Sequence, residues 1–469
     1  MTSDTADIAA DNGKSNCFSG ADANDLECFM KGLRRRNPGE KEFHQAVREV
    51  AADVVPFIAG EPRYQHSLLL ERMTEPDQVV SFRVCWLDDD GNTRANRAWR
   101  VQFNNATGPY KGGLRFDPDL TESVLKFLGF EQCFKNALTG LPIGGAKGGA
   151  NFNPKGKSDG EVMRFCQALM SSMYHYLGEH RDIPAGDIGT GEREVGYLFG
   201  QYRRLTHQFV GALTGKGVAF GGSELRTEAT GYGAVYFLGH MVDRLGGDLE
   251  GRKIAISGAG NVARYAAEKA IELGARVMTL SDSGGLVHFR DGLGQAQLES
   301  LHRLKEERRG ALEEIAGEIG AAYHADKKPW DVECDIALPC AIQNELDDDD
   351  AARLIENGCR IVAEGANMPC TMDAIERLQA SGAIQFAPGK AVNAGGVAVS
   401  GLERTQNAQH MPWPKDEVDE NLGRIMREIH ERCVEHGRAN GDDSVDYRKG
   451  ANIAGFLRLA DAMLAQGVM

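Results

Sequence analysis

The stretch KIAISGAGNVA, residues 253–263, is the strongest indication of the fold of this chain. It joins a short apolar run, typical of a buried strand, to a glycine turn of the pattern G-x-G-x-x-A, and a helical pattern follows directly. The first glycine permits the tight turn, the second lets a pyrophosphate approach the backbone, and the small Ala263 allows helix and strand to pack closely. The helix N-terminus would present amides and a positive dipole to phosphates. A turn with a purely structural role is the alternative interpretation. On the functional interpretation, which we prefer, Gly258, Gly260, Asn261 and Val262 bind a dinucleotide.

Strand-like runs continue beyond this turn and alternate with helical patterns. Such alternation is typical of a parallel, doubly wound sheet. Glycine-rich segments flank the region at 214–222 and 393–396, and such segments suit a hinge or a domain boundary. We therefore predict an α/β protein in which residues 222–400 form a Rossmann-type dinucleotide-binding domain. Its further strands are expected at Val277–Leu280, Ile336–Leu338 and Arg360–Ala363.

The region upstream of residue 222 predicts a second α/β domain. Two alternating runs, Val79–Trp86 and Arg97–Phe103, flank a turn at 90–92, which indicates a hairpin in a mixed sheet. The apolar stripe between Val418 and Cys433 marks a C-terminal helix that we expect to pack back on this domain. Residues 26–221 and 401–469 are thus predicted to form one mixed-sheet domain. Its other helices are expected at Phe43–Ile58, Leu125–Ala137 and about Gly160–Leu177.

Length, charge and residue spacing exclude several classes of function. A chain of 469 residues is too long for one ordinary core, so two domains are expected. The net charge of -15 makes the surface as a whole repel nucleic acid. No apolar run reaches the roughly 18 residues that a membrane span needs. The Cys and His spacings fit no metal-ligand pattern, so no metal site is expected.

The N-terminal residues and the cysteines bear on cellular location. Residues 1–25 are rich in Ser, Asp, Ala and Asn, which predicts a disordered tail. The tail has five aspartates and only Lys14 as a basic residue, unlike an Arg-rich transit peptide, and it has no apolar signal segment. The ten cysteines include no C-x-x-C pair. We therefore expect reduced thiols and a cytoplasmic protein.

Four segments between residues 108 and 189 combine lysines and an aspartate with many glycines. Flexible glycine-rich backbone surrounds Lys111, and Lys147 is expected in a glycine-rich loop. Gln132 and Lys135 share a helix face, and Asp187 lies in a glycine-bounded turn. Taken singly, a solvated lysine or a turn-forming aspartate is the plainer interpretation. Taken together, the glycines permit close approach of a ligand, and three lysines could hold two carboxylates.

These segments closely resemble the hexameric glutamate dehydrogenases of bacteria and lower eukaryotes. The resemblance implies an enzyme that interconverts L-glutamate with 2-oxoglutarate and ammonia, uses a nicotinamide dinucleotide, and assembles as a homohexamer. It makes the mixed-sheet domain the one that binds substrate and forms the oligomer. The acidic N-terminus is the main departure, and no function is carried over to it. The resemblance runs from about residue 30 to Met469 through GPYKGGLRF, KFLGFEQCFKNALTGLPIGGAKGG, PAGDIGTGEREVGYL, RTEATGYG, DIALPCAIQNEL, AEGANMP and ANIAGFLRLADAMLAQGV.

The resemblance also implies a role for each matching residue. Lys147 corresponds to the catalytic lysine and Asp187 to the catalytic acid/base. A lysine near other lysines in a closing cleft should have a lowered pKa, so Lys147 can activate water when neutral and polarise the 2-oxo group when charged. The implied cofactor contacts beyond the glycine turn are Thr230 and Asn393. The implied substrate contacts are Lys111 and Ser400 for the distal carboxylate, Gln132 and Lys135 for the α-carboxylate, and the backbone of Gly186.

The choice between NADP and NAD depends on the end of the second Rossmann strand. Asp282 by rule favours NAD, because an acid there binds the ribose 2′-hydroxyl and repels a 2′-phosphate. Ser283, however, can donate to a phosphate oxygen. The resemblance also matches Lys305 and Arg308 to basic residues near the adenosine ribose of NADP-dependent members. A solvated basic helix face is the alternative. We predict a preference for NADP, with Asp282 turned away or neutralised.

Three other functions stay open at this point. One is a glutamate dehydrogenase that prefers NAD. Another is a leucine, phenylalanine or valine dehydrogenase, which would share the catalytic residues but lack a group for a distal carboxylate, so Lys111 and Ser400 favour glutamate. The third is a non-catalytic regulatory paralogue, which should have lost Lys147 or Asp187, and both are present.

Overall fold

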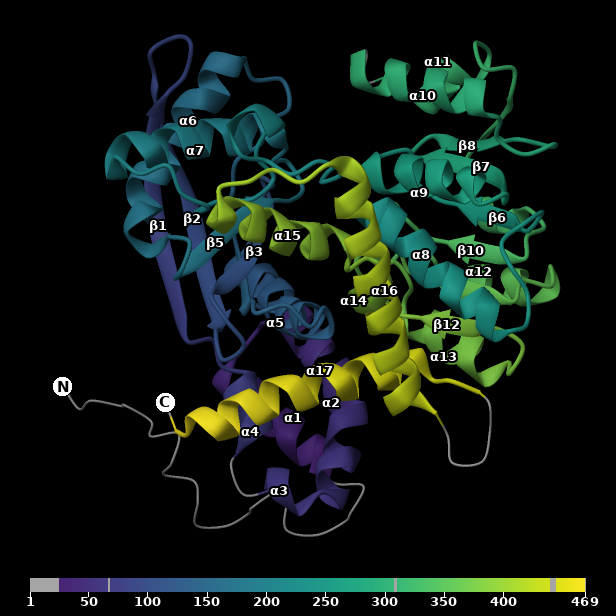
Figure 1. The fold of residues 1–469 in the computed structure, drawn as a ribbon, viewed down its shortest axis with the longest axis horizontal. Coiled ribbons are helices and arrows are strands. Elements are labelled where there is room, and N and C mark those ends of the chain that lie inside the picture. The colour runs from purple at the N-terminus through teal and green to yellow at the C-terminus, as the bar shows by residue number, and fades with distance from the viewer. Residues whose placement is uncertain (1–24, 66–67, 308–309, 439–443, 469) are drawn as a thin grey trace.

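Two separate β-sheets divide the chain into two α/β domains (Figure 1). The structure is a computed structural model, and it describes residues 25–65, 68–307, 310–438 and 444–468. The predicted N-terminal tail lies outside the described residues except for Asp25, where helix α1 begins. No helix in the described part of the chain is long and apolar enough to cross a membrane.

The first sheet is mixed, as predicted, and has the strand order β1-β2-β4-β3-β5. The predicted hairpin is confirmed, because β1 and β2 pair antiparallel with Ser81 opposite Trp99. Strand β3 runs parallel to both β4 and β5 at the other side of the sheet. The strands are β1 (Gln78–Leu87), β2 (Thr93–Asn104), β3 (Tyr110–Phe116), β4 (Gly145–Ala150) and β5 (Asp182–Gly186).

The glycine-rich segments around two of the predicted lysines are strands, not loops. Lys111 lies on β3 and Lys147 on β4, in the interior of the sheet. Glycine is needed here because the backbones approach closely: a Cβ added to Gly112 would lie 1.6 Å from the carbonyl oxygen of Ala146. Glycine is depleted in strands in general, so the local pattern pointed to a loop. The loop prediction for Lys147 was therefore wrong, although the expected close approach is real and is made by a neighbouring strand.

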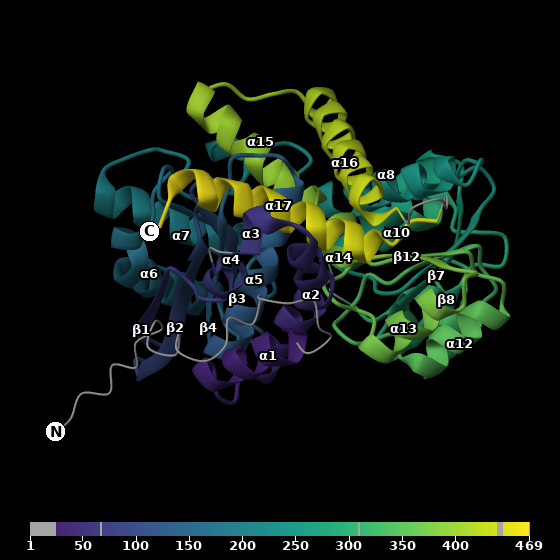
Figure 2. The ribbon, with the colours of Figure 1, turned by 90° about the horizontal axis from the view of Figure 1, so that it is seen from below.

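Helices cover both faces of the first sheet. On one face, α2, α5 and α17 enclose an aromatic core that includes Phe43, Phe103 and Phe456, and Figure 2 shows α17 extending along this domain. On the other face, α6 and α7 pack over Trp86 and Phe116. Helix α6 begins at a capping box of Ser and Glu, as its sequence favours. These helices are α2 (Lys41–Gly60), α5 (Glu122–Leu138), α6 (Asp159–Met173), α7 (Glu192–Thr206) and α17 (Tyr447–Gln466).

The second sheet has the order β12-β11-β10-β6-β7-β8-β9. Five strands from β12 to β7 run parallel, as predicted for a doubly wound domain, and β8 and β9 add an antiparallel edge. The sequence analysis did not predict β8, β9 or β12. The strands are β6 (Lys253–Ile256), β7 (Arg276–Asp282), β8 (Gly285–His288), β9 (Ala322–Ala325), β10 (Ile336–Leu338), β11 (Ile361–Ala363) and β12 (Gln385–Ala387).

The C-terminal helices divide between the two domains. Helix α17 packs on the first domain, as expected. The apolar stripe of α16 instead joins the core around α8 in the second domain, and Tyr236 on α8 donates to Asp419 on α16 at 2.7 Å. The expectation of packing on the first domain was therefore wrong for α16. These helices and their neighbours are α8 (Ala229–Arg244), α9 (Asn261–Glu272), α10 (Gln295–Glu307), α15 (Gly395–Gln409) and α16 (Lys415–Gly437).

The described residues also include several short helices and a disulfide-bonded cysteine. Among the described residues, eight cysteines are free thiols and Cys28 is disulfide-bonded, so the expectation of reduced thiols does not hold at Cys28. The remaining elements are α1 (Asp25–Arg36), α3 (Pro62–Gln65), α4 (Leu69–Met73), α11 (Leu312–Ala316), α12 (Asp348–Glu356), α13 (Met372–Ala380), α14 (Gly389–Val392), and the 3₁₀ turns at Tyr174–Tyr176, Val218–Phe220 and Pro329–Asp331.

Candidate active site

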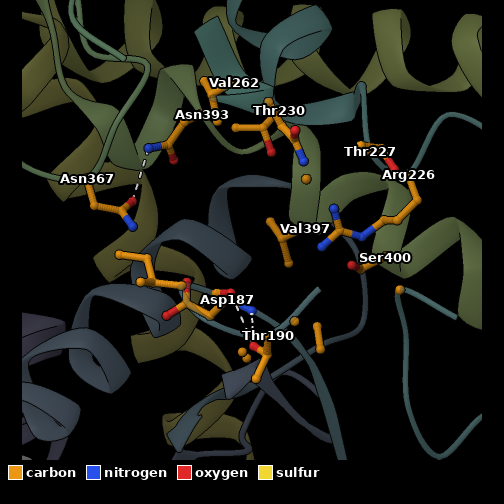
Figure 3. A pocket seen from close by; sticks show the side chains of 18 of the residues that line it. Asp187, Thr190, Arg226, Thr227, Thr230, Val262, Asn367, Asn393, Val397 and Ser400 are labelled. Atoms are coloured by element: carbon orange, nitrogen blue, oxygen red, sulfur yellow. Dashed lines mark hydrogen bonds between the residues drawn. The ribbon is translucent and has the colours of Figure 1, made fainter. Parts of the chain in front are cut away.

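A cavity of about 800 Å³ opens between the two domains. Figure 3 shows Asp187 and Thr190 on one side of it and Thr230, Val262 and Asn393 on the other. Residues of the first sheet, of the loops that follow β10 and β11 in the second, and of α5, α8, α9 and α15 therefore face one space. The residues predicted from the sequence that line the cavity are Lys111, Gln132, Lys135, Lys147, Gly186, Asp187, Thr230, Asn261, Val262, Asn393 and Ser400.

The predicted catalytic pair is in contact. Lys147 Nζ lies 3.1 Å from Asp187 Oδ2, and Arg115 Nε donates to the same oxygen at 2.9 Å. Burial alone would raise the pKa of Asp187, but the two neighbouring cations outweigh it and hold that pKa well below its ordinary value. Burial also lowers the pKa of Lys147, against the opposing effect of Asp187. A lysine that is largely shielded from water and an ionised carboxylate therefore lie side by side, and this arrangement suits proton transfer.

The loop after β5 fixes the position of Asp187. Its backbone N–H donates to Thr190 Oγ1 at 2.7 Å, and the Thr190 hydroxyl in turn donates to the carbonyl oxygen of Leu114 on β3. A Cβ added to Gly113 would lie 2.8 Å from the Asp187 Cβ, so the glycine leaves room for the carboxylate. The close pairing of β3 and β5 therefore positions the acid, and the sequence signal for this was the glycine on the neighbouring strand.

A second group of cations lies near Ser400. Lys111 and Ser400 are each only 1% exposed. Figure 3 shows the guanidinium of Arg226 beside Ser400, and its Nε has no hydrogen-bond partner in the described part of the chain. Burial and the field of Arg226 hold the pKa of Lys111 well below its ordinary value. Sequence reasoning missed Arg226, although it begins the RTEATGYG segment that also contains Thr230.

Lys135 connects the two domains across the cavity. Its Nζ donates to Asn367 Oδ1 at 2.8 Å, and Asn393 Nδ2 donates to the same oxygen at 3.0 Å. Burial lowers the pKa of Lys135 to about 8. Gln132 instead donates to Asn136 Oδ1 at 2.7 Å, one turn along α5. Sequence reasoning missed Asn367, whose signal was its place in the AEGANMP segment.

The glycine turn fits a dinucleotide. Gly258 has a φ of +84°, which a side chain would oppose, and its N–H donates to Ser281 Oγ at 3.0 Å. A Cβ added to Gly260 would meet nothing within 4 Å, so the space beside this backbone is open to a ligand. Helix α9 then begins at Asn261 and directs its free amides to that space. The buried Asn393 Oδ1 also lacks a partner among the described residues. An open backbone approach and an unpaired polar atom are what such a ligand would use.

Asp282, Ser283 and Lys305, which are proposed to select the cofactor, lie outside the cavity lining. Asp282 accepts hydrogen bonds from the backbone N–H groups of Gly284 at 3.0 Å and Leu312 at 2.7 Å, so both carboxylate oxygens are engaged. Lys305 donates to the carbonyl oxygen of Gly310 at 2.7 Å, and burial lowers its pKa while Asp282 opposes the shift. Ser283 is exposed. Arg308 lies outside the described residues.

Comparison with known proteins agrees with this geometry. The family model described as "Glutamate/Leucine/Phenylalanine/Valine dehydrogenase" matches residues 221–467, and the model described as "Glu/Leu/Phe/Val dehydrogenase, dimerisation domain" matches residues 76–204. The NADP-specific glutamate dehydrogenase of Escherichia coli K12 is 54% identical, over 95% of this chain and 99% of that protein.

Two further relatives extend the comparison. The NAD-specific glutamate dehydrogenase of Bacteroides fragilis is 50% identical, over 95% of this chain and 100% of that protein. The crystal structure of the Plasmodium falciparum glutamate dehydrogenase superposes with a TM-score of 0.92 at 48% identity, over 95% of both chains. With both family models matched across the two domains, and relatives this similar over nearly the whole length, the chain belongs to the Glu/Leu/Phe/Val dehydrogenase family.

Proposed function

We propose that this chain is a glutamate dehydrogenase, which interconverts L-glutamate with 2-oxoglutarate and ammonia and uses NADP. The observation that carries the proposal is the Lys147–Asp187 contact of 3.1 Å in a cavity that is also lined by the buried Lys111 and the half-buried Arg226. A lysine and a carboxylate supply the electrophile and the base, and the further cations suit a substrate with two carboxylates. The E. coli relative, named as an NADP-specific glutamate dehydrogenase, supports the same activity.

Asp187 and Lys147 have separate roles in the reaction. Because Lys147 and Arg115 keep Asp187 ionised, Asp187 starts the deamination as a base that can take a proton from the substrate ammonium. Lys147, with its lowered pKa, activates water when neutral and polarises the 2-oxo oxygen when charged. Bound NADP supplies the acceptor of the hydride that leaves the α-carbon. Closure of the two domains would exclude water and set the reacting distance.

The remaining polar residues hold the substrate. Lys111 and Ser400 bind the distal carboxylate, with Arg226 as a further cation of the same cavity. Gln132, Lys135 and the backbone of Gly186 bind the α-carboxylate. A buried cation left without its anion is costly, so an apolar amino acid in this pocket would leave Lys111 and Arg226 unpaired. The pocket therefore disfavours the leucine, phenylalanine and valine alternatives, and the intact Lys147–Asp187 pair disfavours a non-catalytic paralogue.

The substrate part of the proposal is tested by removing the polar groups of the distal pocket. The double variant Lys111→Leu with Ser400→Val should weaken the use of 2-oxoglutarate and favour 2-oxoisocaproate, because the pocket then lacks its anion-binding groups. The measurement is kcat/KM for both oxo acids in wild type and variant, with the NADPH Kd as a control for folding. A double variant that still prefers 2-oxoglutarate would show that the distal carboxylate binds elsewhere.

The preference for NADP depends on the residues around the adenosine ribose. Asp282 has both oxygens engaged by backbone amides, which turns its charge away from a 2′-phosphate. Lys305, and Arg308 by family resemblance, would then supply the positive charge. The ratio of kcat/KM for NADPH over NADH should exceed one and should fall by about two decades or more in Lys305→Ala with Arg308→Ala, since each charge-assisted contact contributes about 1.5–3 kcal/mol. A ratio below one in wild type would support the NAD-preferring alternative, and a ratio that the double variant leaves unchanged would refute the role of Lys305 and Arg308.

Assembly and location are proposed from the family. We propose a homohexamer in the cytoplasm, with residues 26–221 and 401–469, apart from α16, as the substrate-binding and oligomerisation domain and 222–400 as the dinucleotide-binding domain. The dimerisation-domain model matched by residues 76–204 supports self-association through the first domain. These boundaries stay predictions.

A further inference from the structure

Lys216 and Glu403 form a buried ion pair beside the cavity. Lys216 Nζ lies 2.6 Å from Glu403 Oε1, and the two side chains are 1% and 0% exposed. Lys216 also donates to the carbonyl oxygen of Leu213 at 2.6 Å and to Asn407 Oδ1 at 2.9 Å. The other oxygen of Glu403 accepts from the backbone N–H of Gly215 at 2.8 Å. Both carboxylate oxygens of Glu403 are therefore engaged by the loop that links the two domains.

This pair stands next to the cations proposed to hold the distal carboxylate. Glu403 follows Ser400 by about one turn of α15. Lys216 lines the same cavity as Lys111 and Arg226. The negative charge of Glu403 also acts on both of those cations, raising their pKa against the stronger effect of burial. Glu403 is thus an acid of this chain close enough to compete with a substrate carboxylate.

The competition depends on Lys216. In a low-dielectric interior, an uncompensated carboxylate attracts nearby cations strongly and repels a second carboxylate. We propose that Lys216 is a specificity-determining residue: by neutralising Glu403, it leaves Lys111 and Arg226 available for the distal carboxylate of the substrate. The inference rests on the proposed function, because it concerns only a substrate that carries a distal carboxylate.

A purely structural role for the pair makes a different prediction. The pair also fastens the loop at 213–217 to α15, so loss of either partner would loosen the same connection. A structural role therefore predicts that both single substitutions impair substrate binding alike. The electrostatic role predicts opposite effects, since Lys216→Met leaves an extra negative charge near the pocket and Glu403→Gln leaves an extra positive one.

The experiment compares KM for 2-oxoglutarate, at saturating NADPH and ammonium, in wild type, Lys216→Met, Glu403→Gln and the double variant. We expect KM to rise about tenfold or more in Lys216→Met, since like-charge juxtaposition at a binding site is costly. KM should be no higher than wild type in Glu403→Gln and should return to within about threefold of wild type in the double variant, because charges that act on one site couple. The NADPH Kd should stay within about twofold in all three, because the pair does not face the glycine turn.

Lys126→Met is the matched control. Lys126 is another buried lysine in an ion pair, 2.8 Å from Glu40, and it does not line the cavity. Its substitution should leave KM unchanged. A KM raised in both Lys216→Met and Glu403→Gln, and not restored in the double variant, would overturn the inference in favour of a structural role. If Lys216→Met does not fold, a raised KM in Glu403→Gln alone overturns it. A wild type inactive on 2-oxoglutarate would instead refute the proposed function.

Discussion

At the scale of single residues, the site depends on charges that are buried together. Asp187 remains ionised because two cations contact one of its oxygens, while burial lowers the pKa of Lys147 beside it. The identity of these two residues was predictable from the sequence through family resemblance. The third member, Arg115, was not singled out, because an arginine on a strand has no local pattern that distinguishes a site residue from a surface one.

The catalytic pair gives the first prediction. Lys147→Ala and Asp187→Asn should each lower kcat by about 10²–10⁴-fold, the usual loss when a general acid or base is removed. Both variants should still bind NADPH, since neither residue belongs to the glycine turn. Steady-state kinetics and fluorescence titration with NADPH measure the two effects separately. Turnover close to wild type in either variant would refute its catalytic role.

Glu131 gives a prediction about pH. It lies one turn before Lys135 on α5, is 8% exposed, and burial raises its pKa to about 7, against the opposing effect of Lys390. An acid whose folded pKa is raised favours the folded state when protonated. That contribution is fully present below the unfolded pKa of about 4.5 and is lost as pH rises through about 7.

Glu131→Gln should therefore stabilise the protein more at pH 8 than at pH 4.5. The glutamine keeps the shape of the protonated side chain and carries no charge to desolvate, and the difference should reach a few kcal/mol at about 1.4 kcal/mol per pKa unit. Thermal unfolding at the two pH values measures it, with the exposed Glu417→Gln as a control that should shift neither. An equal shift in Tm at both pH values would contradict the raised pKa.

At the scale of elements, a hydrogen bond joins α9, the helix that follows the glycine turn, to α10. Arg264 on α9 donates to Asn261 Oδ1 at 2.9 Å and to His302 Nδ1 on α10 at 2.9 Å. Arginine can only donate, so His302 Nδ1 must accept. Lys305 follows His302 by about one turn, so this contact also sets the distance between the amides at the start of α9 and the proposed phosphate-binding lysine.

We predict that His302→Leu weakens NADPH binding about tenfold, because the lost hydrogen bond to a charged group releases Arg264 and α10 from their positions. His302→Gln retains an acceptor and should stay within about threefold of wild type by the same reasoning. Titration with NADPH measures both. If the leucine variant binds NADPH as tightly as the glutamine variant, the contact does not position the cofactor site.

The strands β3 and β4 could not be predicted from the local sequence. The alternating hairpin β1–β2 and the run 253–256 were predictable, because apolar periodicity reports a buried strand directly. The segments KGGLRF and GAKGGA were not, because their glycines are needed for contacts with strands that are distant in the sequence. Local composition cannot reveal such a tertiary requirement.

At the scale of the whole molecule, the cavity arises only when both domains and α15 are in place. Most of its predicted residues come from separate segments, and only family resemblance assigned them to one site before the structure. Arg226 and Asn367 were missed for the same reason, since each contributes through a position that only the fold reveals. The α16 stripe was visible in the sequence, but its periodicity could not say which domain it would cover.

Assembly is also a property of the whole molecule. We predict a homohexamer, so light scattering should give a mass about six times that of the 51.0 kDa chain. The edge position of β1 in the first sheet and the dimerisation-domain match support self-association. A stable monomer at working concentration would end this prediction, while a dimer or trimer would correct the number of subunits.

We propose that the site around Lys147 and Asp187 catalyses the reductive amination of 2-oxoglutarate. The most direct measurement is the rate of NADPH oxidation by the purified protein with 2-oxoglutarate and ammonium, each also omitted in turn, in wild type and in Lys147→Ala. We expect a rate that requires both substrates, exceeds the rate with 2-oxoisocaproate, and falls by about 10²-fold or more in the variant. A wild type that fails to oxidise NADPH with these substrates, or that prefers 2-oxoisocaproate, would contradict it.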